Sequence, residues 1–145
     1  MKIGTPKEEF DGENRVAMTP DSAKQLMKLG YECAIESGAG AAAGFSDATY
    51  KDAGVTVIKT PAALWKNVDI VAKVRQPNAT ELKRLTKGKT LISFFNPAGN
   101  EEGMAAAKAK GANVIAMEMV PRISRAQKMD ALSSMANIAG YRAVI

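Results

Sequence analysis

The residues best suited to binding chemistry lie in the last part of the chain. A basic turn from Arg122 to Arg125 leads into a stretch that contains neither glycine nor proline until Gly140. At about 3.6 residues per helical turn, several short polar side chains of this stretch fall within an arc of roughly 100°. These are Asp130, Ser133, Ser134, Asn137 and Tyr141. Short polar groups reach only near neighbours, so the pattern predicts a polar wall that faces a ligand or another domain.

Two other interpretations of this helix stay open. Small residues would let another element approach it closely; they are Ala131, Ala136, Ala139, Gly140 and Ala143. The helix would then pack inside a larger core, with its serines bonded to their own backbone carbonyls. Alternatively, the chain is an assembly module that acts by docking, with this helix as its interface. The residues alone do not decide between these and a ligand-facing wall.

Two cations earlier in the chain form a second candidate site. Lys73 and Asn96 each follow a predicted strand, and Arg15 lies in the loop that leaves the first strand. Open α/β sheets bind ligands at the carboxyl ends of their strands. Arg15 and Lys73 are therefore a candidate anion-binding pair, which would hold a carboxylate or phosphate through a planar donor fork and a point charge. The alternative is two solvated surface cations.

Three further patterns have simpler interpretations. The glycines from Gly38 to Gly44 follow the second predicted strand rather than the first. We therefore interpret them as a flexible connection and not as a dinucleotide loop. The acidic residues from Glu8 to Glu13 lack further ligands at fixed spacing, so they predict a solvated loop rather than a metal site. The methionines from Met117 to Met135 predict gap-filling core.

Alternating strand and helix signals define the scaffold that positions these residues. Short apolar runs bounded by turn residues predict strands at 2–5, 31–35, 55–58, 69–72, 90–94 and 113–117. Helical patterns between them begin at Thr19, Ser46, Pro61, Asn78 and Glu101. This alternation predicts an α/β fold: a three-layer, open, mostly parallel sheet of the Rossmann-like or flavodoxin-like kind, followed by a C-terminal connector helix.

Composition limits the classes of function. The 145 residues suit one domain. The net charge is +5, the charged residues are interspersed along the chain, and aromatic residues are few. Such a distribution argues against a nucleic-acid partner. The chain contains no histidine, so the commonest general base and metal ligand is absent, and we expect no metal site. The single cysteine, Cys33, lies in an apolar run and is expected to be inert core.

Three groups of residues together resemble one protein family. The first two are shared by alanine dehydrogenases and proton-translocating NAD(P)+ transhydrogenases. They comprise Ile3 to Glu8, Glu13 to Pro20 and Leu29 to Gly30, then Glu36 to Gly40 and Val71 to Val74. The third group is more specific and is similar to the transhydrogenase alpha subunit. It comprises Pro121 to Gln127, Met129 to Ser134 and Ala139 to Ala143. The resemblance extends over the whole chain.

This resemblance implies that residues 1–145 form the N-terminal lobe of an NAD(H)-binding component. A second lobe with the glycine-rich dinucleotide loop is expected after residue 145, and the terminal helix would connect the two lobes. The positions that match family residues near the nicotinamide end of NAD(H) are Arg122, Gln127, Asp130 and Ser133. Asp130 and Ser133 would offer acceptors and a hydroxyl to a carboxamide or ribose, and Arg122 a donor fork.

The implied activity is direct hydride transfer between NAD(H) and NADP(H), coupled to proton translocation across a membrane. NADP(H) would be bound by a partner component, next to a membrane component. The complete NAD(H)-binding component is expected to be a homodimer on the cytoplasmic side of the bacterial inner membrane. No side chain need act as acid or base, because the cofactor supplies the chemistry. The 145-residue chain alone is expected to be inactive.

The alternative within the same family is an alanine-dehydrogenase-like lobe that binds a 2-oxo acid. Arg15 and Lys73 match the substrate-carboxylate pair of alanine dehydrogenases. Those enzymes, however, place a catalytic histidine where this chain has Asn96. We therefore expect no amino-acid oxidation.

Overall fold

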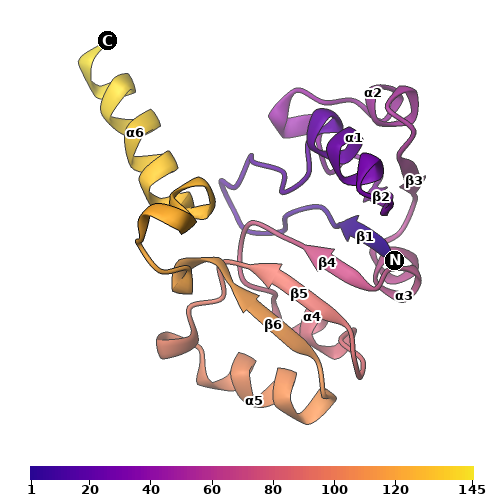
Figure 1. Ribbon diagram of the computed structural model, residues 1–145. Helices are drawn as coiled ribbons and strands as arrows, with labels where there is room; N and C mark the ends of the chain where they lie inside the picture. Colours follow the sequence, from indigo (N-terminus) through magenta and orange to yellow (C-terminus); the bar gives the residue numbers. More distant parts are fainter.

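The computed structural model describes residues 1–145, in which one sheet of six parallel strands is flanked by helices (Figure 1). The strand order is β3-β2-β1-β4-β5-β6. The first three strands therefore extend the sheet in one direction from β1, and the last three extend it in the other. The strands are β1 (Lys2–Thr5), β2 (Glu32–Glu36), β3 (Thr56–Ile58), β4 (Ile70–Ala72), β5 (Thr90–Ser93) and β6 (Asn113–Ala116). The predicted open α/β sheet is confirmed, and every pairing in it is parallel.

The helices fall where the sequence signals place them. They are α1 (Pro20–Lys28), α2 (Asp47–Asp52), α3 (Pro61–Asn67), α4 (Ala79–Lys83), α5 (Glu101–Lys110) and α6 (Ala131–Val144). Side chains cap the N-termini of α1 and α2: the hydroxyl of Thr19 accepts from the backbone N–H of Ser22, and that of Ser46 accepts from the backbone N–H of Thr49. Such caps satisfy backbone donors that would otherwise have no partner at a helix N-terminus.

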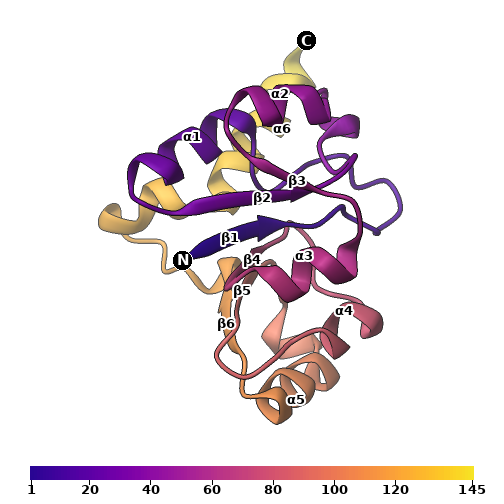
Figure 2. The same cartoon turned by 90° about the vertical axis from the view of Figure 1, so that its right-hand side faces the viewer.

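Alternating side chains of β2 divide the core between the two faces of the sheet. Ala34 points to one face and packs in a cluster with Trp65 of α3, Leu91 of β5 and other buried residues. Cys33 and Ile35 point to the opposite face, where α1 and α2 cover the sheet. Figure 2 shows α1 and α2 on one side of β2 and β3, with α3 on the other. Cys33 is buried, as predicted for inert core.

In the second half of the sheet, the face opposite α4 and α5 is less covered. Ala72 of β4, Ile92 of β5 and Ile115 of β6 are paired in register across the three strands. They point away from the core formed with α5, because alternate residues of a strand face opposite ways. Ala72 and Ile92 are only half-buried, and Ile115 is 48% exposed. The three-layer arrangement is thus complete over β1 to β3 and only partial over the second half.

The terminal segment extends away from the sheet (Figure 1). A short 3-10 helix, η4 (Ser124–Met129), precedes α6, so the predicted helix begins later than the residue pattern suggested. No residue of α6 is buried, which excludes a helix packed within the core of these residues. The prediction of methionine core is wrong for Met119 and Met129, which are 68% and 56% exposed, while Met117 and Met135 are half-buried. Another 3-10 turn, η3 (Met117–Met119), lies against α6.

Candidate functional site

The segment around η4 forms a hollow of about 290 Å³, which we call the terminal hollow. It is lined by Arg122, Ile123, Ser124, Gln127, Asp130 and Ser133. All four residues that the family resemblance selected therefore lie around one space. A 3-10 helix followed directly by an α-helix brings them together, because the turn between the two elements folds residues 122–124 against the first turn of α6.

Asp130 is 9% exposed, which makes it the most buried of the residues that line the terminal hollow. Its carboxylate caps α6: Oδ1 accepts from the backbone N–H groups of Leu132 and Ser133, each at 3.1 Å. Oδ2 accepts from the hydroxyl of Ser133 at 2.5 Å. These bonds, led by that from the Ser133 hydroxyl, lower the pKa of Asp130, and the charge of Arg122 adds to the effect. The residue is thus a fixed, ionised acceptor.

The rim of the terminal hollow carries donors without partners. Arg122 and Gln127 are exposed, and neither side chain makes a hydrogen bond or ion pair within the chain. Ser133 is exposed as well. The site therefore combines a planar guanidinium fork and an amide, both free, with a carboxylate and a hydroxyl already locked together. Such a set can hold a neutral polar group such as a carboxamide or a ribose.

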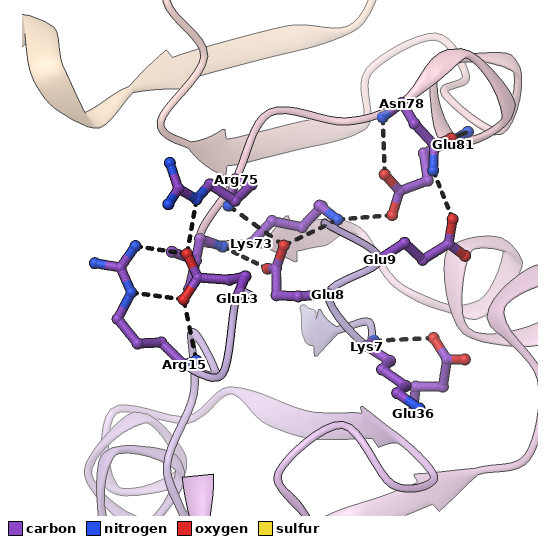
Figure 3. A network of polar contacts seen from close by, with 11 residues as sticks. Lys7, Glu8, Glu9, Glu13, Arg15, Glu36, Lys73, Arg75, Asn78 and Glu81 are labelled. Atoms are coloured by element: carbon purple, nitrogen blue, oxygen red, sulfur yellow. Dashed lines mark hydrogen bonds and ion pairs between the residues drawn. The ribbon is translucent and has the colours of Figure 1, made fainter. Parts of the chain in front are cut away.

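Lys73, from the predicted anion pair, lies instead in a closed cluster (Figure 3). Its side chain is 2% exposed, and its ammonium binds Glu81 at 2.8 Å and Glu8 at 3.4 Å. Both carboxylates have further donors: Glu8 accepts from the backbone N–H of Val74 at 2.7 Å, and Glu81 from that of Asn78 at 2.9 Å. We call Glu8, Lys73 and Glu81 the Lys73 cluster. Every charge in it is paired.

Arg15, the other member of the predicted pair, binds a different carboxylate. Its Nε and Nη2 donate to the two oxygens of Glu13 at 2.7 and 2.6 Å, and Arg75 Nε donates to Glu13 at 2.7 Å. These donors, first of all Arg15, lower the pKa of Glu13 to about 2. The third nitrogen of Arg15 contacts the sulfur of Met135 at 2.9 Å, which joins this loop to α6. Lys73 is thus not a solvated cation, whereas the Arg15 side chain stays 41% exposed, and carboxylates of this chain bind both.

Sequence reasoning missed the residues that occupy these cations. The expectation of a solvated acidic loop is wrong for Glu8 and Glu13, whose side chains are each 3% exposed, while Glu9 and Asp11 are exposed as expected. Arg75 was not singled out at all. One signal was readable, since Asn78 and Glu81 have the spacing of a helix capping box. The pairing of Glu8 with Lys73 joins positions far apart in the chain and leaves no local pattern.

Asn96, the third residue expected at the strand ends, lies in another hollow, of about 440 Å³. It shares this space with Arg75 rather than with Lys73. Its backbone is left-handed, with φ 53°, and Glu118 accepts from the backbone N–H groups of Phe95 and Asn96. Asparagine tolerates this conformation better than most residues, so the turn needs no special function to explain it.

The Gly38–Gly44 segment is closed by side chains of α2 and its surroundings. Asp47 accepts from the backbone N–H of Gly38 at 2.8 Å and from the Ser37 hydroxyl at 2.6 Å. A side chain at Gly40 would meet the Tyr50 ring at 2.6 Å. The glycines therefore serve close packing and a tight turn rather than approach of a pyrophosphate.

None of the chain's helices has both the length and the apolar character that crossing a membrane requires. The family described as alanine dehydrogenase/PNT, N-terminal domain, matches residues 4–139. The NAD(P) transhydrogenase subunit alpha of Cereibacter sphaeroides is 67% identical over 145 residues, which cover 100% of this chain and 28% of that relative. The alanine dehydrogenase of Bacillus subtilis (strain 168) is 36% identical over 143 residues, covering 99% and 37%.

A solved structure shows the same fold. The transhydrogenase from Sinorhizobium meliloti superposes with a TM-score of 0.94 at 42% identity, covering 99% of this chain and 43% of that one. The chain thus spans less than half the length of these relatives. Because the family domain matches nearly all of it and a solved relative has the same fold, the chain belongs to the alanine dehydrogenase/PNT family and corresponds to its N-terminal domain.

Proposed function

We propose that this segment forms one wall of the NAD(H) site of a proton-translocating transhydrogenase, with the terminal hollow at the nicotinamide end. The observation that carries the proposal is the meeting of Arg122, Gln127, Asp130 and Ser133 around one open space. The relative with 67% identity is named NAD(P) transhydrogenase subunit alpha, which favours this activity over amino-acid oxidation.

In this proposal the nucleotide is shared with a second lobe, which carries the glycine-rich loop and lies outside residues 1–145. Two features support the division. The glycine segment of this chain is filled by its own side chains, and the chain spans only part of its relatives. The exposed helix α6 connects the lobes, and its lack of buried residues fits a helix that another lobe completes.

The protein's part in the reaction is to hold the ring, while the cofactor supplies the hydride. Arg122 and Gln127 donate to the carboxamide oxygen of NAD(H), and Ser133 and Asp130 fix the other side of that group. Hydride passes directly to NADP(H) on a partner component, and a membrane component couples this step to proton translocation. No proton transfer by a side chain is needed, so the absence of histidine is no obstacle.

The assembly around this segment is part of the proposal. The complete NAD(H)-binding component is a homodimer, held at the cytoplasmic face of the bacterial inner membrane by its partner components. Binding of a 2-oxo acid through Arg15 and Lys73 is not proposed, because Lys73 is buried between two carboxylates and Arg15 is bidentate to Glu13.

An NMR titration tests the placement of NAD(H). We expect NADH added to the ¹⁵N-labelled chain to shift the amides of residues 122–133, with weak affinity because half of the cleft is absent. Pyruvate should leave the amides near Lys73 and Arg15 unchanged. Shifts at Lys73 with pyruvate, or NADH shifts confined to segments far from η4, would overturn the proposal. So would robust transhydrogenation by the 145-residue chain alone.

A further inference from the structure

Helix α6 is attached to the rest of the chain near its start. Ala131 and Met135 are its only half-buried residues, and all its others are exposed, up to 90% at Val144. At about 1.5 Å per residue, its 14 residues reach about 20 Å, so a small rotation at the start moves the far end by several ångströms. The direction in which α6 leaves the sheet (Figure 1) therefore depends on a few contacts of its first turns.

Met135 contacts a guanidinium whose position is fixed from outside α6. Nη1 of Arg15 donates to Met135 Sδ at 2.9 Å. Nε and Nη2 of the same side chain donate to the two oxygens of Glu13, which Arg75 holds from another direction (Figure 3). Because a guanidinium is planar, the two bonds to Glu13 also fix the direction of Nη1. The loop after β1, and not the helix, thus decides where this nitrogen points.

The turn η3, which lies against α6, is fixed in a similar manner. Glu118 of η3 accepts from the backbone N–H groups of Phe95 and Asn96, which ties this turn to the end of β5. Two carboxylates, Glu13 and Glu118, therefore hold two elements that contact α6. The helix meets a rigid support at its start, while its outer turns contact nothing within the described chain.

We propose that Arg15 is a positioning residue that sets the direction of α6 and thereby the placement of the second lobe against this one. The inference rests on the proposed function in one respect, namely that α6 connects the two lobes. We call Glu13, Arg15 and Met135 the α6 anchor. A thioether sulfur is a weak acceptor, so the α6 anchor favours one orientation of the helix without preventing others. Loss of one such polar contact is worth about a factor of ten in population.

The test measures the orientation of α6 in the full-length subunit. Spin labels are attached at Lys108→Cys on α5 and at Val144→Cys on α6, because both positions are exposed, whereas the native Cys33 is buried. Pulsed electron paramagnetic resonance then gives the distribution of distances between the labels. Met135→Leu keeps an apolar side chain but removes the acceptor. We expect the population outside the main distance to rise by about tenfold in this variant.

A second substitution at the same position separates the contact from packing. Met135→Gln supplies an amide oxygen that accepts from Arg15, so we expect the wild-type distribution. If Met135 served only to pack, leucine would be tolerated better than glutamine, and the order would be reversed. Arg15→Lys, which lacks the planar fork, should resemble Met135→Leu. Arg75→Ala is the control, because it removes a donor from Glu13 that does not reach α6, and it should keep the wild-type distribution.

NADH titration of the same variants separates the inference from the proposed function. Met135→Leu should weaken NADH binding by only about twofold, because apparent affinity falls with the fraction of molecules in the binding orientation. A wild-type distance distribution in Met135→Leu overturns the inference whatever the affinity, and so does a Met135→Gln variant that behaves like Met135→Leu. If NADH does not perturb residues 122–133 of the wild-type subunit, the proposed function fails, while the distances still decide whether Arg15 orients α6.

Discussion

Two polar regions of this chain differ in how their charges are satisfied. In the Lys73 cluster, a buried ammonium is enclosed by two carboxylates that are each 3% exposed and hold backbone donors besides. In the terminal hollow, Arg122 and Gln127 are exposed and have no side-chain partner. Buried charges that are fully paired within the chain have no free capacity for a ligand, whereas donors at a rim without partners are free to bind. We therefore interpret the first region as structural, and the second is the proposed binding site.

The largest expected effect tests the structural half of this comparison. Lys73→Ala leaves Glu8 and Glu81 as buried charges without their cation, so we expect the free energy of unfolding to drop by about 3–5 kcal/mol. Urea denaturation followed by Trp65 fluorescence measures the change. Lys66→Ala, which removes an exposed lysine of α3, is the control and should change stability by less than about 0.5 kcal/mol. A Lys73 variant as stable as the control contradicts a structural role.

The binding half of the comparison predicts the reverse pattern at Arg122. Arg122→Ala should leave stability within about 0.5 kcal/mol of wild type. In the full-length subunit it should weaken NADH binding by about ten- to a hundredfold, the worth of a hydrogen bond from a charged donor. Arg125→Ala is the matched control, because Arg125 is exposed in the same η4 segment but does not line the hollow. Equal losses of affinity in both variants would point to general electrostatic attraction instead.

Acid titration sharpens the comparison at Glu13, which belongs with the paired charges. Its pKa is lowered from 4.5 to about 2, so its stabilising contribution is present above pH 4.5 and is lost as the pH falls through 2. Because Arg15 and Arg75 are 41% and 45% exposed, solvent screens the pair, and we expect a loss of about 1–2 kcal/mol. Measured stability of wild type and Glu13→Gln should converge over this range. A constant difference between them contradicts the assignment.

The smallest effect concerns the helix that carries the terminal hollow. Asp130→Ala removes the cap of α6 and should destabilise its first turn by about 1 kcal/mol. Because α6 has no buried residue, global unfolding should hardly change. Amide exchange at Leu132 and Ser133 is the appropriate measurement, and Asp130→Asn, which retains a capping oxygen, is the control. Loss of global stability in Asp130→Ala would mean that α6 packs more firmly than its exposure indicates.

Much of the scaffold could be predicted from the sequence because its signals are local. The alternation of apolar runs with helical patterns located all six strands, and Thr19 and Ser46 marked two helix starts. Asp130, which the pattern placed on the polar face of the terminal helix, lies just before that helix, again for a local reason. Asp130 is polar and spaced like a helical residue, but its side chain bonds the backbone N–H groups of the next turn, which makes it a cap.

Family resemblance identified the residues of the terminal hollow. It did not predict that carboxylates of this chain bind Arg15 and Lys73. Arg122, Gln127, Asp130 and Ser133 lie within twelve positions of one another, so one turn of chain suffices to gather them. Arg15 and Lys73 were expected to converge on a ligand, and the structure gives each a carboxylate of this chain instead. That they bind no external anion remains a prediction.

By itself the sequence determined the order and type of the elements and the kinship of the chain, because periodicity, caps and motifs are properties of neighbouring residues. Only the tertiary structure decided which charges are neutralised. Glu8 reaches the backbone of Val74 across 66 positions, and Arg15 meets Met135 across 120. Such contacts depend on how strands and loops are brought together in space, and electrostatic pairing depends on distance and burial rather than on order along the chain.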